Sequence, residues 1–389
     1  MNIKSLTVLS LFFLLWCCNT KHTSDKAHDT EPAEALSRAD SILEIENSVF
    51  PIQIDPRANY EKKGFVFFQD ICKVEYIPLE TNENCLLGEK FTSFGGMFLD
   101  DENLFILSRG QIFRFDRKGK FINTVGKRGQ GPGEIALLSD FKINEETKEV
   151  LILDGKTKHI HFYTYNGTVK KSIPLEFFSL SFDISGNNQV ICAHAFPLKH
   201  APMIFSASCN TGETVSEIYL NKKPITGKTV ALMNYYTGNK SYNNKYICNI
   251  YLSDTIFCVD KKTLELHPRY IRSSSHAGPK GDDPSLFLLF ETDRYANLLI
   301  SNGRTPDRST YIVDKKANKI YNGLFGDIER GTSVVPINTN RDNIVVDLYE
   351  AHKLTDLLSN NLLSGKLKEI AETLDDEDNP VLMIATFRQ

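Results

Sequence analysis

The chain has 389 residues, with 45 Lys and Arg against 49 Asp and Glu, and 41% of its residues are hydrophobic. This composition lies far from the low-hydrophobicity, high-charge range of chains that stay disordered. The formal net charge of -4 excludes the basic surface typical of nucleic-acid-binding proteins, so we expect no nucleic acid among its partners.

Residues 1–17 are predicted to be a lipoprotein signal peptide. Residues 6–16 form an apolar run, which is shorter than the about twenty residues of a membrane-spanning helix and is typical of a signal-peptide core. Leu15 lies three residues before Cys18, a pattern that resembles the bacterial lipoprotein box, in which the cysteine becomes the lipidated first residue. Cleavage before Cys17 would place a bulky tryptophan at the cut, so Cys18 is the predicted lipidation site. The alternative is an ordinary secretory signal with incidental cysteines.

Residues 18–48 are predicted to be a flexible tether between the lipid and the folded domain, because they are polar, charged and poor in aromatic residues. The weakly acidic body that follows does not favour adsorption to an anionic membrane, so the lipid is the expected membrane contact. We therefore expect the protein in the cell envelope, anchored to the outer membrane and either periplasmic or surface-exposed.

Residues 49–389 are predicted to form an all-β fold, a six-bladed β-propeller. From residue 63 onward, short runs rich in Phe, Tyr, Val, Ile and Thr alternate with turns of Gly, Asn, Asp and Lys. A strand–turn–strand unit recurs five times, with spacings of 48, 45, 51 and 54 residues between its turn residues. These turn residues are Gly119, Gly167, Gly212, Thr263 and Ala317. Such a period, with several strands in each unit, is typical of propeller blades.

The sixth blade is expected to combine the two ends of this body. Residues 66–77 at the start would join residues 343–346 and 381–384 at the finish, which closes the ring and removes an exposed sheet edge. Between the last two runs, residues 347–376 carry leucines and other apolar residues at three- and four-residue steps, which is helical periodicity. We expect a short helical insertion that caps the propeller within the last blade. A helical docking surface is the alternative.

Cysteine and histidine spacing gives no indication of a metal. Six cysteines lie beyond the processing site: Cys72, Cys85, Cys192, Cys209, Cys248 and Cys258. Their even count permits disulfides, but none forms a CxxC pair, so most are interpreted as small buried residues and zinc is disfavoured. His159 and His161 share one face of a predicted strand, without a third ligand at diagnostic spacing, and are interpreted as two surface histidines. We expect no metal and no cofactor.

Several phrases of the sequence resemble a bacterial lipoprotein family of 6-bladed β-propeller proteins, related to NHL-repeat propellers. The phrases are residues 76–80, 119–134, 254–256 and 379–382, together with the lipid box. Residues 129–134, Gly-Gln-Gly-Pro-Gly-Glu, are similar to the stretch by which an NHL blade's outer strand crosses to the next blade's inner strand. The resemblance implies a membrane-anchored propeller in the envelope and no particular reaction.

The glycine-rich segment 126–134 is the best candidate for contact with a ligand. A phosphate-binding P-loop needs Gly-Lys-Ser/Thr at the start of a helix, whereas proline and glutamate follow here without a helical pattern. Glycines with positive φ in a blade crossover explain the segment better. Because propeller loops carry function, Arg128, Gln130 and Glu134 are the candidate ligand-binding residues.

The functional expectation is a binding or protein-interaction module whose blade-top loops and channel mouth take an envelope protein, a glycan or a peptide. The alternative is a propeller enzyme, a lyase or hydrolase acting on a glycan or peptide at the channel mouth, with catalytic residues that the sequence does not identify. A channel lined by His, Arg and carboxylates would favour the enzyme. A channel filled with Phe, Tyr and Leu would favour the interaction module.

Overall fold

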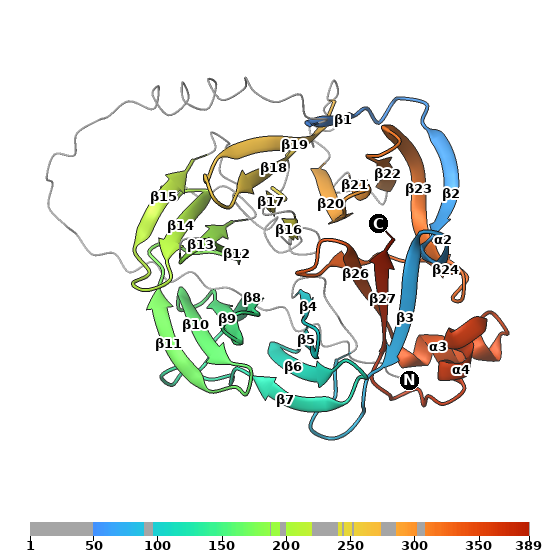
Figure 1. Ribbon diagram of the computed structural model, residues 1–389, viewed down its shortest axis with the longest axis horizontal. Coiled ribbons are helices and arrows are strands. Elements are labelled where there is room, and N and C mark those ends of the chain that lie inside the picture. Colours follow the sequence, from blue (N-terminus) through green and yellow to red (C-terminus); the bar gives the residue numbers. More distant parts are fainter. Residues whose placement is uncertain are drawn as a thin grey trace, which may run out of the picture. The chain divides into compact units, whose positions relative to one another are not determined.

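The computed structural model describes residues 50–88, 96–186, 188–194, 200–219, 240–242, 245–250, 253–273, 285–301 and 308–388. The predicted signal peptide, Cys18 and the tether lie outside these residues. The described residues belong to one compact unit, Val49–Gln389. Within it, six small sheets are arranged in a ring (Figure 1), which confirms the predicted all-β, six-bladed β-propeller.

Blades 1 to 3 follow chain order, and each is an antiparallel sheet of four strands. Blade 1 contains β4 (Met97–Leu99), β5 (Asn103–Ser108), β6 (Gln111–Asp116) and β7 (Phe121–Val125). Blade 2 contains β8 (Leu138–Asn144), β9 (Glu149–Asp154), β10 (His159–Thr164) and β11 (Val169–Pro174). Blade 3 contains β12 (Ser181–Ser185), β13 (Gln189–Ala193), β14 (Ile204–Ser208) and β15 (Thr214–Ile218).

Blades 4 to 6 also take up strands from the start of the described chain. Blade 4 contains β16 (Lys240–Tyr242), β17 (Lys245–Cys248), β18 (Thr255–Asp260), β19 (Leu266–Arg272) and β1 (Ile52–Ile54). Blade 5 contains β20 (Ser285–Glu291), β21 (Tyr295–Ser301), β22 (Arg308–Asp314), β23 (Lys319–Asp327), β2 (Glu61–Phe67) and β24 (Thr332–Ser333). Blade 6 contains β25 (Ile337–Asn338), β26 (Ile344–Tyr349), β27 (Val381–Phe387) and β3 (Cys72–Pro78).

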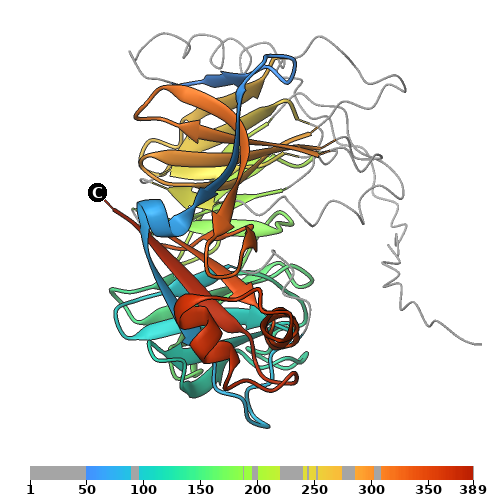
Figure 2. The same ribbon diagram turned by 90° about the vertical axis from the view of Figure 1, so that its right-hand side faces the viewer.

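The first described strands run along the outside of blades 4, 5 and 6 (Figure 2). Strands β1 and β2 add in parallel to β19 and β23, and after helix α2 (Phe68–Ile71) β3 pairs antiparallel with β27. The predicted closure of the ring by strands from both ends is therefore confirmed. One detail of that prediction is wrong: Val66 lies in β2 opposite Phe325 of blade 5 and takes no part in blade 6.

The helical insertion of the last blade is present between β26 and β27, as α3 (Ala351–Ser359) and α4 (Gly365–Ala371). It starts later than the periodicity indicated, because Asp347 and Tyr349 still pair with β27. Leu354 and Leu367 are fully buried in the cluster between blades 5 and 6, so the helices cap the propeller as expected. In the described segments, none of the helices is long and apolar enough to cross a membrane.

The core is divided into six clusters, one between each pair of neighbouring blades. Between blades 1 and 2, for example, the rings of Phe98 and Phe141 meet edge to face with centroids 4.9 Å apart. Full burial of one such side chain contributes about 1.5–3 kcal/mol. Because every blade packs on two neighbours, the ring is expected to unfold as a unit.

The six described cysteines are all free and buried. This confirms their interpretation as small core residues. Burial raises the pKa of the Cys72 thiol to about 12, so this group stays protonated and unreactive at neutral pH.

Candidate binding site on the crossover face

The ring has two faces with different connections. Because the strands of each blade are antiparallel, the short turns such as 100–102 and 117–120 lie on one face, the turn face. The crossovers between blades, such as 126–137 and 328–336, lie on the other, the crossover face, together with α3 and α4. The glycine-rich candidate segment is therefore on the crossover face.

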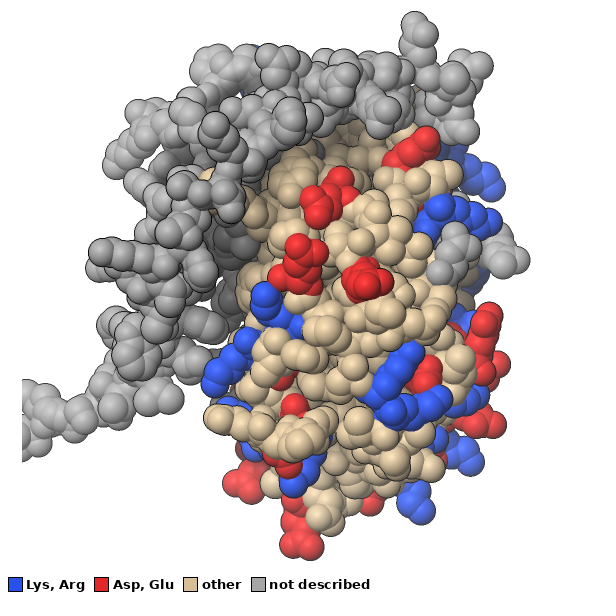
Figure 3. Space-filling view, turned by 90° about the vertical axis from the view of Figure 1, so that its left-hand side faces the viewer, with Lys and Arg blue, Asp and Glu red and all other residues tan. Residues whose placement is uncertain are grey.

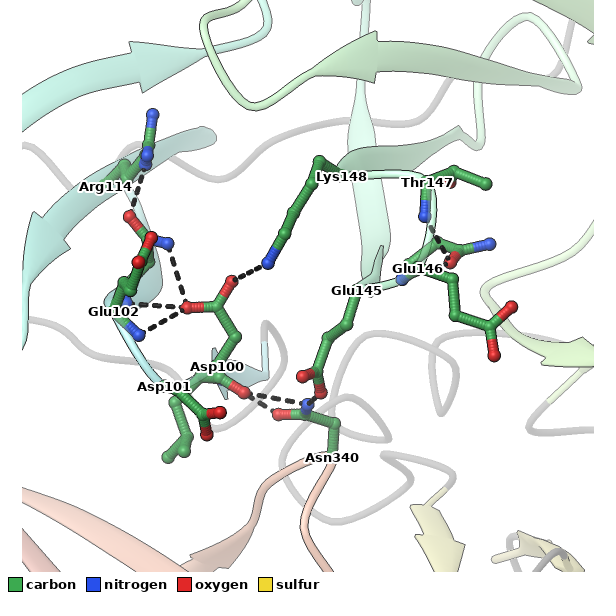
Figure 4. A network of polar contacts seen from close by, with 12 residues as sticks. Asp100, Asp101, Glu102, Arg114, Glu145, Glu146, Thr147, Lys148 and Asn340 are labelled. Atoms are coloured by element: carbon green, nitrogen blue, oxygen red, sulfur yellow. Dashed lines mark hydrogen bonds and ion pairs between the residues drawn. The ribbon is translucent and has the colours of Figure 1, made fainter.

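On the turn face, Asp100 is the centre of a polar network that joins blades 1 and 2 (Figure 4). Its carboxylate accepts hydrogen bonds from the backbone N–H groups of Glu102 and Asn103, at 2.9 and 2.7 Å. It also pairs with the Lys148 ammonium of blade 2 at 3.3 Å. Burial tends to raise the pKa of Asp100, but these donors outweigh it and hold the pKa below its usual value.

Asn340 extends this network to blade 6 (Figure 4). Its side-chain oxygen accepts the Leu99 N–H group and its side-chain nitrogen donates to the Leu99 carbonyl oxygen, each at 2.9 Å. The same nitrogen donates to Glu145 of blade 2 at 2.8 Å. Arg341 pairs with the same Glu145 at 2.6 Å. These side chains already satisfy one another across three blades, so the network acts as a structural tie between them.

The outer wall of blades 2 and 3 carries charges of both signs (Figure 3). Lys170 and Lys171 are exposed on β11, and Glu213 and Glu217 are exposed on or beside β15. Mixed charge of this kind produces no strong field of one sign, so attraction of a ligand there depends on individual residues.

The crossover from blade 1 to blade 2 is a tightly hydrogen-bonded loop. Gly129 N–H donates to Ile135 O at 3.0 Å, and Ile135 N–H donates to Lys127 O at 2.8 Å. At the tip, Glu134 N–H donates to Gly131 O at 2.9 Å, and Gly131 N–H donates to the Glu134 carboxylate at 3.0 Å. The backbone of this loop is thus set in advance of any ligand.

The three predicted ligand-binding residues lie together on this loop but in different settings. The Glu134 carboxylate is turned into the loop and pairs with Lys127 at 2.6 Å, a contact that lowers the pKa of Glu134. A side chain at position 129 would overlap this carboxylate, so Glu134 would have to shift. Arg128 and Gln130 are exposed. Glu134 therefore shapes the loop, while Arg128 and Gln130 are available to a ligand.

Asp154, at the end of β9, fixes the far end of the same loop. Its carboxylate is completely buried and accepts the N–H groups of Ala136 and Leu137 at 2.7 and 3.2 Å. It also accepts the Lys156 N–H group at 2.9 Å. One carboxylate therefore holds both the crossover and the adjacent turn of blade 2 in place.

The predicted histidine pair lies beside Asp154. The rings of His159 and His161 stack with centroids 5.9 Å apart, which confirms that they share one strand face. His161 Nδ1 is 2.7 Å from Ser172 Oγ, whereas its Nε2 is 4.0 Å from Asp154, beyond hydrogen-bond reach. The prediction of two surface histidines is wrong for His161, which is buried, and this burial lowers its pKa. Across the described residues, no group of three His, Cys, Asp or Glu is arranged to hold a metal.

The inner strands of blades 1, 2 and 3 bring a cation between aromatic rings. Lys142 Nζ lies 5.0 Å from the ring centroid of Phe98 and 5.3 Å from that of Phe182. It pairs with Asp140 at 2.8 Å, and Asp140 also accepts the Phe182 N–H group. The side chains in this sector of the inner ring are therefore packed together and satisfy one another.

Sequence reasoning identified the loop but missed the residues that hold it. Asp154 precedes Gly155 at a strand end, a turn signal that could have indicated a role in the local backbone. Tyr163 donates a hydrogen bond to Gly133 O, and nothing in its strand pattern distinguishes it from other core aromatics.

The ring of six sheets, with the crossovers between blades on one face, defines the protein as a six-bladed β-propeller. The chain matches, over residues 51–386, the family described as Domain of unknown function (DUF4934), and it belongs to that family. A comparison with curated proteins finds no match.

Two solved structures are similar to this chain. A Bacteroides fragilis protein described as exported is similar over 87% of this chain and 100% of its own, with 17% identity and a TM-score of 0.67. A DUF4221 family member from Bacteroides vulgatus covers 82% of this chain and 97% of its own, with 11% identity and a TM-score of 0.49. At 17% identity, the first similarity supports the fold alone.

Proposed function

We propose that this protein is a lipid-anchored binding module of the bacterial envelope. The signal-peptide pattern and Cys18 supply the anchor, and residues 18–48 supply a tether long enough to let the propeller reach a partner away from the membrane. The Bacteroides fragilis protein with the same fold is described as exported, which supports an envelope location. The ligand would be an envelope protein, a glycan or a peptide.

One observation carries the binding role: the backbone of the crossover 126–137 is held by its own hydrogen bonds, yet the side chains of Arg128 and Gln130 are exposed. A loop that is ordered before binding loses little conformational entropy when a ligand docks. The turn face differs, since its charged groups around Asp100 are already paired with one another. Binding is therefore assigned to the crossover face.

A photo-crosslinking amino acid at position 130 of the full chain tests this assignment in native envelopes. The matched control is position 118, which is exposed on the turn face. We expect one saturable adduct from position 130 and none from position 118. Equal labelling from both positions, or none from position 130, would contradict the proposal.

The anchor has its own test. Cys18→Ala should abolish incorporation of a labelled fatty acid and leave the protein unprocessed or released from the membrane, whereas Cys17→Ala should be labelled normally. Unchanged labelling of the Cys18→Ala variant would contradict the assignment of Cys18 as the lipidation site.

A further inference from the structure

The crossover from blade 5 to blade 6 forms a second built loop on the crossover face. After β23 the chain turns back on itself, so that β24 pairs with the end of β23, Gly326 with Ser333 and Asp327 with Thr332. Residues 328–331 form the tip of this hairpin, between the last blade and the helical insertion.

Asp327 fixes the base of the loop. Its carboxylate is fully buried and accepts hydrogen bonds from the Tyr76 and Tyr349 hydroxyls at 2.8 and 2.7 Å and from the Gln69 amide at 2.7 Å. The Glu329 N–H group also donates to it at 2.9 Å. With the Arg330 N–H group, which donates at 3.3 Å, five donors from three parts of the chain hold the hairpin in one conformation.

The helical insertion supports the loop from the other side. Ser364 N–H donates to the Glu329 carbonyl oxygen at 3.0 Å, and Leu367 N–H donates to the Glu329 carboxylate at 2.7 Å. Glu329 is therefore engaged at both its backbone and its side chain. The next residue along the tip, Arg330, is hydrogen-bonded within the described residues only through its backbone, whose N–H group donates to the Asp327 carboxylate at 3.3 Å.

Arg330 is a half-buried guanidinium without an ion-pair partner in the described part of the chain. Its Cζ lies 4.5 Å from the ring centroid of Tyr349, and its buried Nε makes no hydrogen bond there. Arg269 and Arg341, by contrast, form ion pairs with Glu291 and Glu145, each at 2.6 Å. The Nε of the buried Arg272 resembles that of Arg330 in having no hydrogen-bond partner among the described residues. A desolvated donor of this kind favours a ligand that brings an acceptor.

Thr332 gives a second group of the same kind on the same loop. Its Oγ1 is buried and has no hydrogen-bond partner among the residues described. A planar guanidinium and a hydroxyl two residues further along the loop together suit a carboxylate, which accepts two hydrogen bonds from an arginine and has lone pairs to spare.

The charges around Arg330 favour a single negative charge over a doubly charged phosphate. The buried carboxyl group of Asp327 already lies at the base of the loop that carries Arg330. Loss of water around its side chain raises the pKa of Asp347 to about 6, with Arg330 opposing this rise and Asp327 adding to it. A site in which one carboxyl group is already hard to ionise would repel a dianion more than a monocarboxylate.

Aliphatic side chains are exposed around the same hairpin. Ile328, Val335 and Leu362 are 45%, 55% and 58% exposed. The Leu362 carbonyl oxygen lies 3.7 Å from where a side chain on Gly331 would begin, so the α3–α4 connection borders the tip. Sugars usually stack on open aromatic faces, but the nearby Tyr349 ring is covered by Arg330. These features suit a peptide better than a glycan.

We propose that the loop 328–335 binds a carboxylate flanked by aliphatic side chains, as presented by a peptide segment of a partner protein. Arg330 and Thr332 contact the carboxylate, and Ile328 and Leu362 contact the aliphatic groups. The proposal rests on the proposed function, because it names a ligand class for the same crossover face.

The test uses N-acetyl-leucine, a carboxylate beside an aliphatic side chain, and N-acetyl-leucinamide, which lacks the charge. Binding of each to the full chain is followed by ligand-observed NMR titration. We expect the acid to bind at least about tenfold more tightly than the amide, the effect of one charge-assisted contact. Arg330→Gln should remove this difference, and Thr332→Val should reduce it. Arg57→Gln, at an exposed site on the first described segment, should leave it unchanged.

Unfolding curves of each variant show whether the ring is intact, and the near-isosteric Thr332→Val variant keeps the test informative if Arg330→Gln is unstable. Equal binding of acid and amide would overturn the proposal, as would acid binding that survives in folded Arg330→Gln. Tighter binding of glucuronate than of N-acetyl-leucine would overturn the peptide assignment. If Arg128→Gln lost N-acetyl-leucine binding while Arg330→Gln kept it, the proposal would be overturned and the 126–137 loop would be the binding site. The crosslink from position 130 tests the proposed function independently of all these results.

Discussion

The hydroxyl of Tyr349 donates a 2.7 Å hydrogen bond to the carboxylate of Asp327, and this contact joins the last blade to the crossover that leads into it. Tyr76, from the strand that closes the ring, donates to the same carboxylate at 2.8 Å. One buried acidic group thus connects blade 5, blade 6 and the start of the folded chain. Ring closure and the shape of the 328–335 loop depend on the same residue.

Tyr349→Phe should lower the free energy of unfolding by about 1.5–3 kcal/mol, because it removes a hydrogen bond to a buried charged group. The matched control is Tyr219→Phe, which removes a hydroxyl bonded to Glu217 on a side chain that is 58% exposed. That change should cost less than about 0.5 kcal/mol. Urea unfolding of both variants checks the prediction, and equal losses would argue against a special role for the buried contact.

Gly212→Ala should destabilise the protein more than Gly110→Ala. Both glycines have positive φ, +80° and +74°, so both substitutions carry the strain of that conformation. Only at position 212 would the new methyl group overlap a neighbouring backbone atom, Pro174 O of the preceding blade. The first change should therefore exceed the second by at least about 1 kcal/mol. Indistinguishable thermal unfolding temperatures would show that the blades can separate enough to accept the methyl group.

The same contact explains why the blade repeat could be predicted from the sequence. Gly119 and Gly167, like Gly212, form the turn before an outer strand and lie close to a carbonyl oxygen of the preceding blade, Pro78 O and Thr124 O. A local conformational demand recurs once in each of these blades, so it leaves a periodic signal in the chain.

Other features leave no such signal. Strands β1 and β2 pair in parallel with blades 4 and 5, and nothing in their own residues specifies those distant partners. Likewise, Arg330 belongs to no motif, and its unpaired state depends on side chains that only the closed ring brings together. The 126–134 loop could be found because its glycines are contiguous, whereas the 328–335 loop could not.

Deletion of residues 381–389 should abolish cooperative unfolding of the whole propeller. Strand β27 lies between β26 and β3, so its loss disconnects the closing strand from the rest of blade 6. Removal of Gln389 alone is the control, because it leaves β27 complete. Calorimetry should show no sharp transition for the longer deletion and a normal one for the control. A normal transition in the longer deletion would refute closure of the ring through this strand.

Asp347→Asn should stabilise the protein at neutral pH and have less effect in acid. Loss of water around the side chain raises the pKa of Asp347 to about 6, whereas in the unfolded chain it stays near the ordinary value for aspartate, about 3.9. The native state therefore favours the protonated form, and its advantage is lost as pH rises through the native pKa. The neutral amide avoids this loss, by up to about 3 kcal/mol at pH 7, and it still accepts the Leu348 N–H group.

Asp100→Asn should show the opposite pH dependence. Hydrogen bonds from Glu102 and Asn103 hold the pKa of Asp100 below its usual value in spite of burial. Its contribution to stability is therefore present above the unfolded-state pKa and is lost as pH falls through the native one. The amide variant should be less stable than the parent at pH 7 and approach it in acid. Unfolding free energies of the parent and both variants between pH 3 and pH 8 check the two signs together. Curves that shift in the same direction would contradict the contrast between Asp347, where burial outweighs the hydrogen-bond donors, and Asp100, where the donors outweigh burial.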